Sequence, residues 1–129
     1  MATIFSRIIS GEIPCHKVAE NDRFIAFLDI LPVAKGHVLV IPKVEVDYIF
    51  DLDTETLSEI NLFARDVAQK IFRAVPCKRV GIAVIGLEVP HAHMHLVPLN
   101  TMSDIDFSKP RVKMTQEEFA ELAEKIRTA

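Results

Sequence analysis

The chain has little cysteine, no tryptophan and no long apolar run. Its two cysteines, Cys15 and Cys77, stand far apart and form no Cys-x-x-Cys pair, so we expect a reducing cytoplasm and no disulfide framework. No apolar run approaches the ~20 residues that span a bilayer, and the N-terminus lacks the basic-then-apolar pattern of a secretion signal. We therefore expect a cytoplasmic protein with no membrane partner.

The chain also has little excess of one sign of charge over the other, because its formal net charge is only −3. This small negative value disfavours a broad attraction to nucleic acid. It leaves room for a small anionic ligand, since local hydrogen-bond donors can outweigh a weak global field. The 129 residues are half hydrophobic and show no repeat or linker, which indicates one globular domain over residues 1–129.

The apolar pattern predicts an α+β fold. Strands are expected at residues 24–29, 37–41, 79–85 and 91–97. Helices are expected at residues 3–10, at 54–75 and from Thr115 onward. Only five residues separate the last two strands, so these strands are expected to pair antiparallel.

Helix caps and one long loop complete this pattern. Asp53 or Thr54 is suited to cap the long helix, and Thr115 with Glu118 fits a capping box for the last one. The loop over residues 100–114 is long and polar, which is typical either of a functional loop or of a mobile surface. The order of strands, helix, strands and helix favours an antiparallel sheet.

The most informative stretch reads His91-Ala92-His93-Met94-His95-Leu96-Val97. If it is a strand, the three histidines share one face, because successive side chains of a strand point to opposite faces. Three imidazoles in a row contribute little to a core. They are suited to proton transfer, metal ligation or nucleophilic attack near neutral pH.

Two chemical interpretations of the histidines stand about equal on the residues alone. Zinc often takes three histidines, but the outer two Cα atoms of a strand run lie ~13 Å apart, so all three cannot reach one ion. Two neighbours together with His37 could do so. Alternatively, a neutral imidazole attacks phosphorus, and the flanking histidines donate to phosphate oxygens and to the leaving group.

With Pro98, the histidine run resembles the signature of the histidine triad (HIT) family, in its HINT-like branch of nucleotide phosphoramidases and hydrolases. Further stretches resemble that family in the expected order, at residues 4–5, 11–14, 27–30 and 36–43. The resemblance thus runs from about Ile4 to Pro98. It implies a five-stranded antiparallel sheet with helices, paired into a homodimer.

The resemblance also implies catalytic roles. His93 would attack the α-phosphorus of a nucleoside phosphoramidate or a related nucleotide conjugate. A nucleotidyl-histidine intermediate would form, and water would then release the nucleoside monophosphate. His95 would contact the α-phosphate, His91 would position the nucleophile, and His37 would support the histidine network.

Nucleotide contacts follow from the same resemblance. Asp29 would accept hydrogen bonds from the ribose hydroxyls, and Ile30 would pack beside the base or sugar. The turn before the triad, with Glu88 and Val89, would lie near the phosphate, where backbone amides supply donors. No metal or cofactor is expected for the chemistry.

The chain departs from the family pattern in two places. Thr3 and Ser6 stand where many relatives have a zinc-binding Cys-x-x-Cys pair, so no zinc is expected there. Near the triad, Ala83 stands where relatives often carry an amide side chain, and Glu88 adds a negative charge unless it points to solvent. These changes motivate an alternative, a nucleotide-binding regulatory module with weak or vestigial catalysis.

Overall fold

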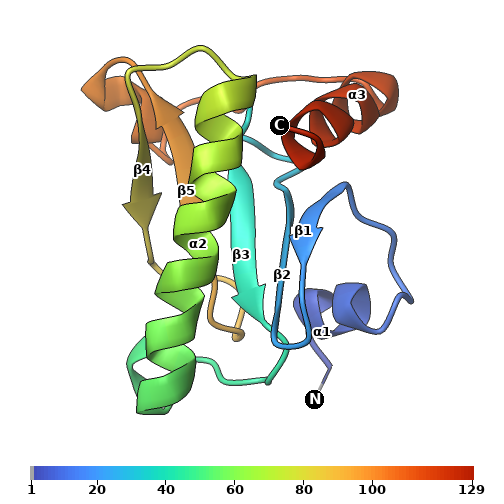
Figure 1. Cartoon of the computed structure of the whole chain (residues 1–129), viewed down its shortest axis with the longest axis vertical. Helices are drawn as coiled ribbons and strands as arrows, with labels where there is room; N and C mark the ends of the chain where they lie inside the picture. The colour runs from blue at the N-terminus through green and yellow to red at the C-terminus, as the bar shows by residue number, and fades with distance from the viewer. Residues whose placement is uncertain (1) are drawn as a thin grey trace.

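The computed structural model describes residues 2–129 and contains a five-stranded antiparallel sheet flanked by helices (Figure 1). The strands are β1 (Lys17–Glu20), β2 (Phe24–Leu28), β3 (Val38–Pro42), β4 (Arg79–Ala83) and β5 (Met94–Leu99). Their spatial order is β1-β2-β3-β5-β4, and every neighbouring pair is antiparallel. The predicted α+β class and the pairing of β4 with β5 are confirmed.

The helices are α1 (Ile4–Ile9), α2 (Thr54–Ala74) and α3 (Gln116–Arg127), with short 3-10 turns at η1 (Ile49–Asp51) and η2 (Met102–Ile105). The predicted caps are present. The Asp53 side chain accepts a hydrogen bond from the Thr56 amide, and Thr115 and Glu118 bond reciprocally across the first turn of α3. Pro76 follows the end of α2 and cannot continue a helix.

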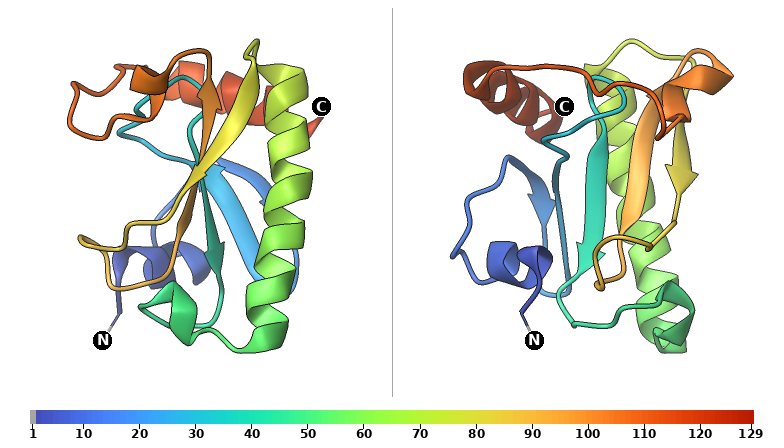
Figure 2. Two further views of the ribbon diagram at one scale, coloured as in Figure 1. Left: turned by 90° about the vertical axis from the view of Figure 1, so that its left-hand side faces the viewer. Right: turned by 180° about the vertical axis from the view of Figure 1, so that it is seen from behind.

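One face of the sheet is covered by α2 and α3, as Figure 1 and the left view of Figure 2 show. Alternate residues of the central strands point to this side, because strand side chains alternate between faces. They form the larger core with the buried stripes of the two helices, which include Ile60, Val67 and Ile71 of α2 and Phe119 and Ile126 of α3. This layer stabilises the sheet that positions the histidines.

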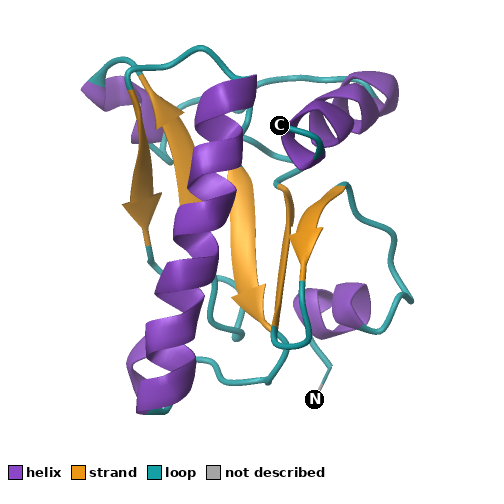
Figure 3. Cartoon of the chain, in the orientation of Figure 1, coloured by secondary structure: helices purple, strands orange, loops and turns teal. Residues whose placement is uncertain are grey.

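The opposite face carries a smaller apolar cluster under α1. The cluster consists of Phe5, Ile25, Phe27, Leu39 and Ile41. The two long loops, at residues 84–93 and 100–114, lie on this same side of the sheet (Figure 2, left; Figure 3). The helix α1 and both loops thus lie on the side of the sheet opposite α2 and α3 (Figure 2, left).

Two features of the sheet differ from the predictions. The short edge strand β1 was not predicted from the residues, because only Val18 of its four residues is fully buried and the alternation is too brief to read. The histidine run was predicted as strand from His91, but β5 begins at Met94. Before that point the Ala92 amide bonds to the carbonyl of Val46, outside the sheet ladder.

Residues 2–129 include both cysteines of the chain. Cys15 and Cys77 both carry free thiols. None of the helices over residues 2–129 combines the length and the apolar character that a transmembrane span requires.

Candidate active site

A row of residues in register across the sheet provides the base of the site. Phe27 of β2 pairs with Leu39 of β3, Leu39 pairs with His95 of β5, and His95 pairs with Ala83 of β4. Directly paired residues of neighbouring strands project to the same face. His95 therefore has an apolar neighbour on one side and the small Ala83 methyl on the other.

His93 is held by the backbone just before it. Its Nδ1 lies 2.8 Å from the carbonyl oxygen of His91. A carbonyl only accepts, so His93 Nδ1 carries the proton, and the neutral ring has its lone pair on Nε2. The Phe5 ring contacts the His93 ring edge-on at 5.0 Å and fixes its orientation. The site thus holds an imidazole with one nitrogen available for attack.

His91 anchors this arrangement from below. It is fully buried, and its Nε2 donates to the carbonyl oxygen of Pro42 at the end of β3, at 2.8 Å. The His91 amide donates to the Val89 carbonyl at 2.8 Å, which closes a tight turn ahead of the histidines. His91 Nδ1 is the one buried side-chain nitrogen or oxygen over residues 2–129 without a hydrogen-bond partner. The bonds from His91 to the carbonyls of Pro42 and Val89 hold the His91 backbone, whose own carbonyl orients His93.

A second chain of hydrogen bonds fixes the remaining two histidines. The Val33 amide donates to His37 Nδ1 at 3.1 Å, so the proton of neutral His37 is on Nε2. His37 Nε2 lies 2.9 Å from His95 Nδ1 and donates to it. The proton of neutral His95 is consequently on Nε2, on the opposite side of its ring. His95 thus offers a hydrogen-bond donor beside the His93 ring, whose centre lies 5.0 Å away.

Burial and neighbouring cations keep this pair uncharged. Burial lowers the pKa of His37 to about 3, and the electrostatic influence of His95 and Arg111, which opposes a second positive charge, lowers it further. Burial likewise lowers the pKa of His95 to about 4, followed by the influence of His93 and Arg111. The tautomers deduced from the hydrogen bonds are therefore the forms present at neutral pH.

Asp29 lies beside the histidine pair at the end of β2. Its Oδ2 is 3.6 Å from His37 Nε2, and its Oδ1 accepts from the Leu31 amide at 2.8 Å. Burial raises the pKa of the Asp29 carboxyl, while the Leu31 amide and Arg111 oppose the shift. The adjacent Ile30 side chain is 60% exposed, so an apolar surface flanks the carboxylate. The structure thus brings Asp29, His37 and His95 together.

The turn before the triad lies at the edge of this group. Glu88 is exposed, whereas Val89 packs against the apolar cluster that contains Phe5. Gly86 adopts a left-handed φ of 73°, which a glycine readily allows in such a turn. The two predicted site residues of this turn therefore differ in environment, since Val89 is partly buried against the cluster and Glu88 is exposed to solvent.

A cation site at Asp29, His37 and His95 satisfies the distances but not the hydrogen-bond pattern. One potential ligand atom from each lies within 4.8 Å of the others. A metal ligand must offer a lone pair, yet His37 Nε2 carries the proton because the Val33 amide occupies Nδ1. Thr3 and Ser6 bond to each other as a helix cap, so they are engaged in starting α1. The hydrogen bonds of His37 and His95 therefore fix the positions of their protons and do not favour binding of a metal ion.

Two residues of the site were not predicted, Phe107 and Arg111. Both come from the loop over residues 100–114, whose length and polarity are typical either of a functional loop or of a mobile surface. The Phe107 ring contacts the His95 ring at 4.8 Å and the His37 ring at 5.9 Å. The Arg111 guanidinium lies over the Phe107 ring, 5.6 Å from the ring centre. A lone aromatic residue within a polar loop was the only signal in the sequence.

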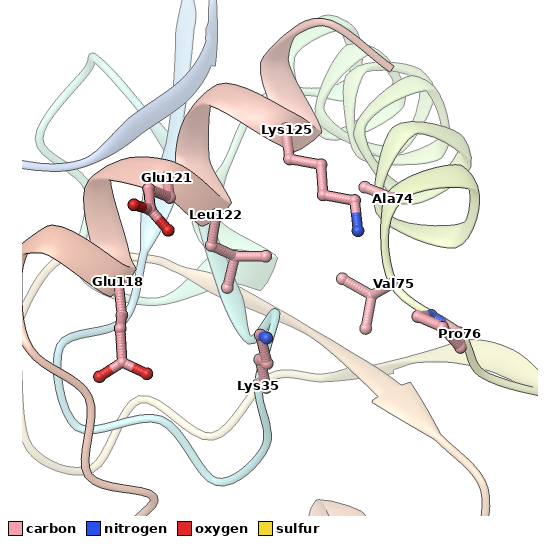
Figure 4. Close-up of a pocket in the computed structure, with 8 residues that line it drawn as sticks. All are labelled: Lys35, Ala74, Val75, Pro76, Glu118, Glu121, Leu122 and Lys125. Atoms are coloured by element: carbon pink, nitrogen blue, oxygen red, sulfur yellow. The ribbon is translucent and has the colours of Figure 1, made fainter.

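A separate cavity of about 310 Å³ lies between α3 and the C-terminal end of α2 (Figure 4). Its lining residues are Lys35, Ala74, Val75, Pro76, Glu118, Glu121, Leu122 and Lys125. It contains none of the histidines and carries charges of both signs, as the sticks in Figure 4 show. It is not part of the candidate active site.

Comparisons with known proteins agree with the fold. The model of the HIT domain family matches residues 10–102. The adenosine 5'-monophosphoramidase hnt1 of Schizosaccharomyces pombe is 32% identical over 132 residues, which cover 98% of this chain and 96% of that protein. An uncharacterized HIT-like protein of Helicobacter pylori is 37% identical over 101 residues, 73% of this chain and 93% of that protein.

Solved structures lead to the same result. The crystal structure of a Hit-like protein from Bartonella henselae superposes with a TM-score of 0.85 at 32% identity, covering 98% of this chain and 94% of that one. The HIT domain model spans more than two thirds of the chain. The alignments with the fission yeast protein and the Bartonella henselae protein cover most of both chains. The chain therefore belongs to the HIT family.

Proposed function

We propose that this protein hydrolyses nucleoside 5'-phosphoramidates or related nucleotide conjugates at the α-phosphorus, through a covalent nucleotidyl-histidine intermediate on His93. The observation that carries the proposal is the bond from His93 Nδ1 to the His91 carbonyl, which leaves the Nε2 lone pair as the nucleophile. The named activity of the fission yeast relative, an adenosine 5'-monophosphoramidase, supports the same class of substrate.

In the first step, His93 Nε2 forms a bond to phosphorus while the bond from phosphorus to the amine nitrogen breaks. The amine leaves with a proton taken from water. The nucleotidylated ring is positively charged, and its Nδ1 proton remains bonded to the His91 carbonyl, which stabilises that charge. A water molecule then attacks phosphorus, the bond to Nε2 breaks, and the nucleoside monophosphate leaves. The proton lost by the attacking water neutralises the hydroxide that remained when the amine took its proton.

The neighbouring histidines serve the phosphate in this scheme. His95 donates from Nε2 to a phosphate oxygen, because its Nδ1 already accepts from His37. His37 keeps His95 in that tautomer through the bond from the Val33 amide. A donor that is fixed before the substrate arrives needs no reorganisation as charge develops in the transition state. Neither a metal nor a cofactor takes part.

Asp29 and Ile30 receive the nucleoside. The partly buried Asp29 carboxylate can accept hydrogen bonds from a neutral ribose diol, and it would repel a phosphate. The exposed Ile30 side chain then packs beside the sugar or base. Val89 packs against the apolar cluster that contains Phe5, and the backbone around Glu88 and Val89 offers amide donors for the phosphate.

The assay is release of adenosine monophosphate from adenosine 5'-phosphoramidate. We expect His93→Ala to lower kcat by at least about 10⁴-fold, since it removes the nucleophile. His16→Ala is the matched control, because His16 bonds to Gln116 of α3 outside the histidine group. Mass spectrometry of rapidly quenched reactions should trap a nucleotidyl adduct on His93. Full activity of His93→Ala would contradict the mechanism.

A second candidate is a nucleotide-binding regulatory module with weak catalysis. Ala83 favours it, because the residue in register with His95 has no polar atom to offer the phosphate. This candidate predicts that wild-type protein binds adenosine monophosphate but turns over phosphoramidates very slowly. Rapid turnover by wild-type protein would eliminate it.

We further propose that the whole chain forms one cytoplasmic domain that assembles as a homodimer through the outer edge of β4. As an edge strand, β4 leaves one row of backbone groups unpaired within the described chain, and such edges readily accept another strand. Apolar surface is exposed here, since Ile82 of β4 is 58% exposed and Phe72 of α2, which lines a hollow together with Arg79 and Val80 of β4, is 52% exposed. Sedimentation velocity tests this, with Phe72→Glu expected to yield monomers and Leu87→Glu serving as a control at an exposed residue outside β4 and α2.

A further inference from the structure

The segment over residues 107–112 is joined to the loop that carries Asp29 and Ile30. Arg111 Nη1 donates to the Leu31 carbonyl at 2.8 Å, and the Val112 amide donates to the Pro32 carbonyl at 2.8 Å. Both bonds connect parts of the chain that are about 80 residues apart. They attach the segment over residues 107–112 to the part of the candidate site that is proposed to bind the nucleoside.

Arg111 itself is fixed from two further directions. Its Nη2 donates to the Phe107 carbonyl at 3.4 Å, and its guanidinium lies over the Phe107 ring. The other contacts of that ring are with His37 and His95. A planar guanidinium suits this role, because one of its faces can lie over an aromatic ring while its N–H groups, which lie in its own plane, donate to two carbonyls.

The bond to Leu31 matters because Leu31 also holds the carboxylate. The Leu31 amide donates to Asp29 Oδ1 at 2.8 Å, while the Leu31 carbonyl accepts from Arg111. The position of Leu31 thus couples Arg111 to the orientation of Asp29. Residues 107–112 lie beyond the part of the chain that the HIT domain model matches, which ends at residue 102.

We propose that Arg111 is a positioning residue, which sets Asp29 for the 2'- and 3'-hydroxyls of a ribonucleotide and makes the site selective for ribonucleotides over 2'-deoxyribonucleotides. Phe107 is the platform that seats Arg111 against the histidine pair. The proposal rests on the proposed function only for the location of the sugar. It concerns binding, so its test does not require turnover.

The test is isothermal titration calorimetry of wild-type protein and variants with adenosine monophosphate and 2'-deoxyadenosine monophosphate. We expect wild-type protein to prefer the ribonucleotide. Arg111→Ala should weaken ribonucleotide binding by about tenfold, the size of one lost charged hydrogen bond, and leave deoxyribonucleotide binding within about twofold. Arg111→Lys should restore part of the preference, since a lysine can donate to the Leu31 carbonyl but cannot stack on Phe107.

Lys113→Ala is the matched control, because Lys113 is an exposed cation directly after this segment. It should leave both affinities unchanged. Phe107→Leu is a second variant that keeps Arg111 but removes its aromatic platform, and it should lower the preference by about threefold. An unchanged preference in Arg111→Ala and Phe107→Leu, or equal losses for both nucleotides, would overturn the proposal. If wild-type protein binds and discriminates but never hydrolyses, only the proposed catalysis fails.

Discussion

Acidification should destabilise this protein through His37 and His95. Both imidazoles are buried, with pKa values of about 3 and about 4, whereas an unfolded histidine has a pKa of 6.5. Between these values the unfolded chain binds more protons than the folded one. The free energy of unfolding therefore falls as the pH decreases, and the contribution of the neutral pair is fully present only above pH 6.5.

The magnitude follows from the pKa differences. One pKa unit corresponds to about 1.4 kcal/mol, so between pH 8 and pH 5 each histidine lowers the free energy of unfolding by about 2 kcal/mol. The two histidines together contribute at most about 4 kcal/mol. This sum is an upper limit, because the two rings share one hydrogen bond and do not titrate independently. Asp29 acts in the opposite sense, since its raised pKa favours protonation in the folded state.

The assay is urea unfolding of wild-type protein and His95→Gln at pH 8, 6.5 and 5. Glutamine can still accept a hydrogen bond from His37 but does not titrate, so the variant should lose about 2 kcal/mol less over this range. Nitrogen-15 NMR of the imidazoles gives a direct check. Both rings should stay neutral at pH 5, with protons on Nε2. Titration of either ring with a midpoint near 6.5, or identical losses in the two proteins, would refute the reasoning.

Two other predictions concern glycine and metal. Gly36→Ala should lower the free energy of unfolding by more than the about 2 kcal/mol expected from its left-handed φ of 98° alone, because the new Cβ would lie 3.0 Å from side-chain atoms of Val75 and Pro98. Gly11→Ala is the control, with a φ of 84° and no atom within 4 Å; equal losses in urea unfolding would contradict the packing argument. Dialysis against a metal chelator should leave phosphoramidate hydrolysis unchanged, since His37 offers no lone pair to a metal; activity that is lost and then restored by zinc would show otherwise.

Sequence patterns were sufficient to predict those structural features that depend only on residues close together along the chain. The period of about 3.6 residues in α2 and its Asp53 cap, and the capping box of α3, were readable because neighbours along the chain make these interactions. The alternation of the histidines also predicted a shared face. It did not predict where β5 begins, because the Val46 carbonyl that binds the Ala92 amide lies on a different part of the chain.

The site shows the same division. The sequence by itself determined that several imidazoles lie close together, since residue spacing on an extended chain requires it, and the family motif added Asp29. Only the tertiary structure decided which ring nitrogen carries each proton, because the deciding partners, such as the Val33 amide and the Pro42 carbonyl, are backbone groups that no residue type specifies. It also decided that Phe107 and Arg111 contact the histidine pair and the Asp29 loop, because interactions between segments about 80 residues apart depend on how the whole chain packs.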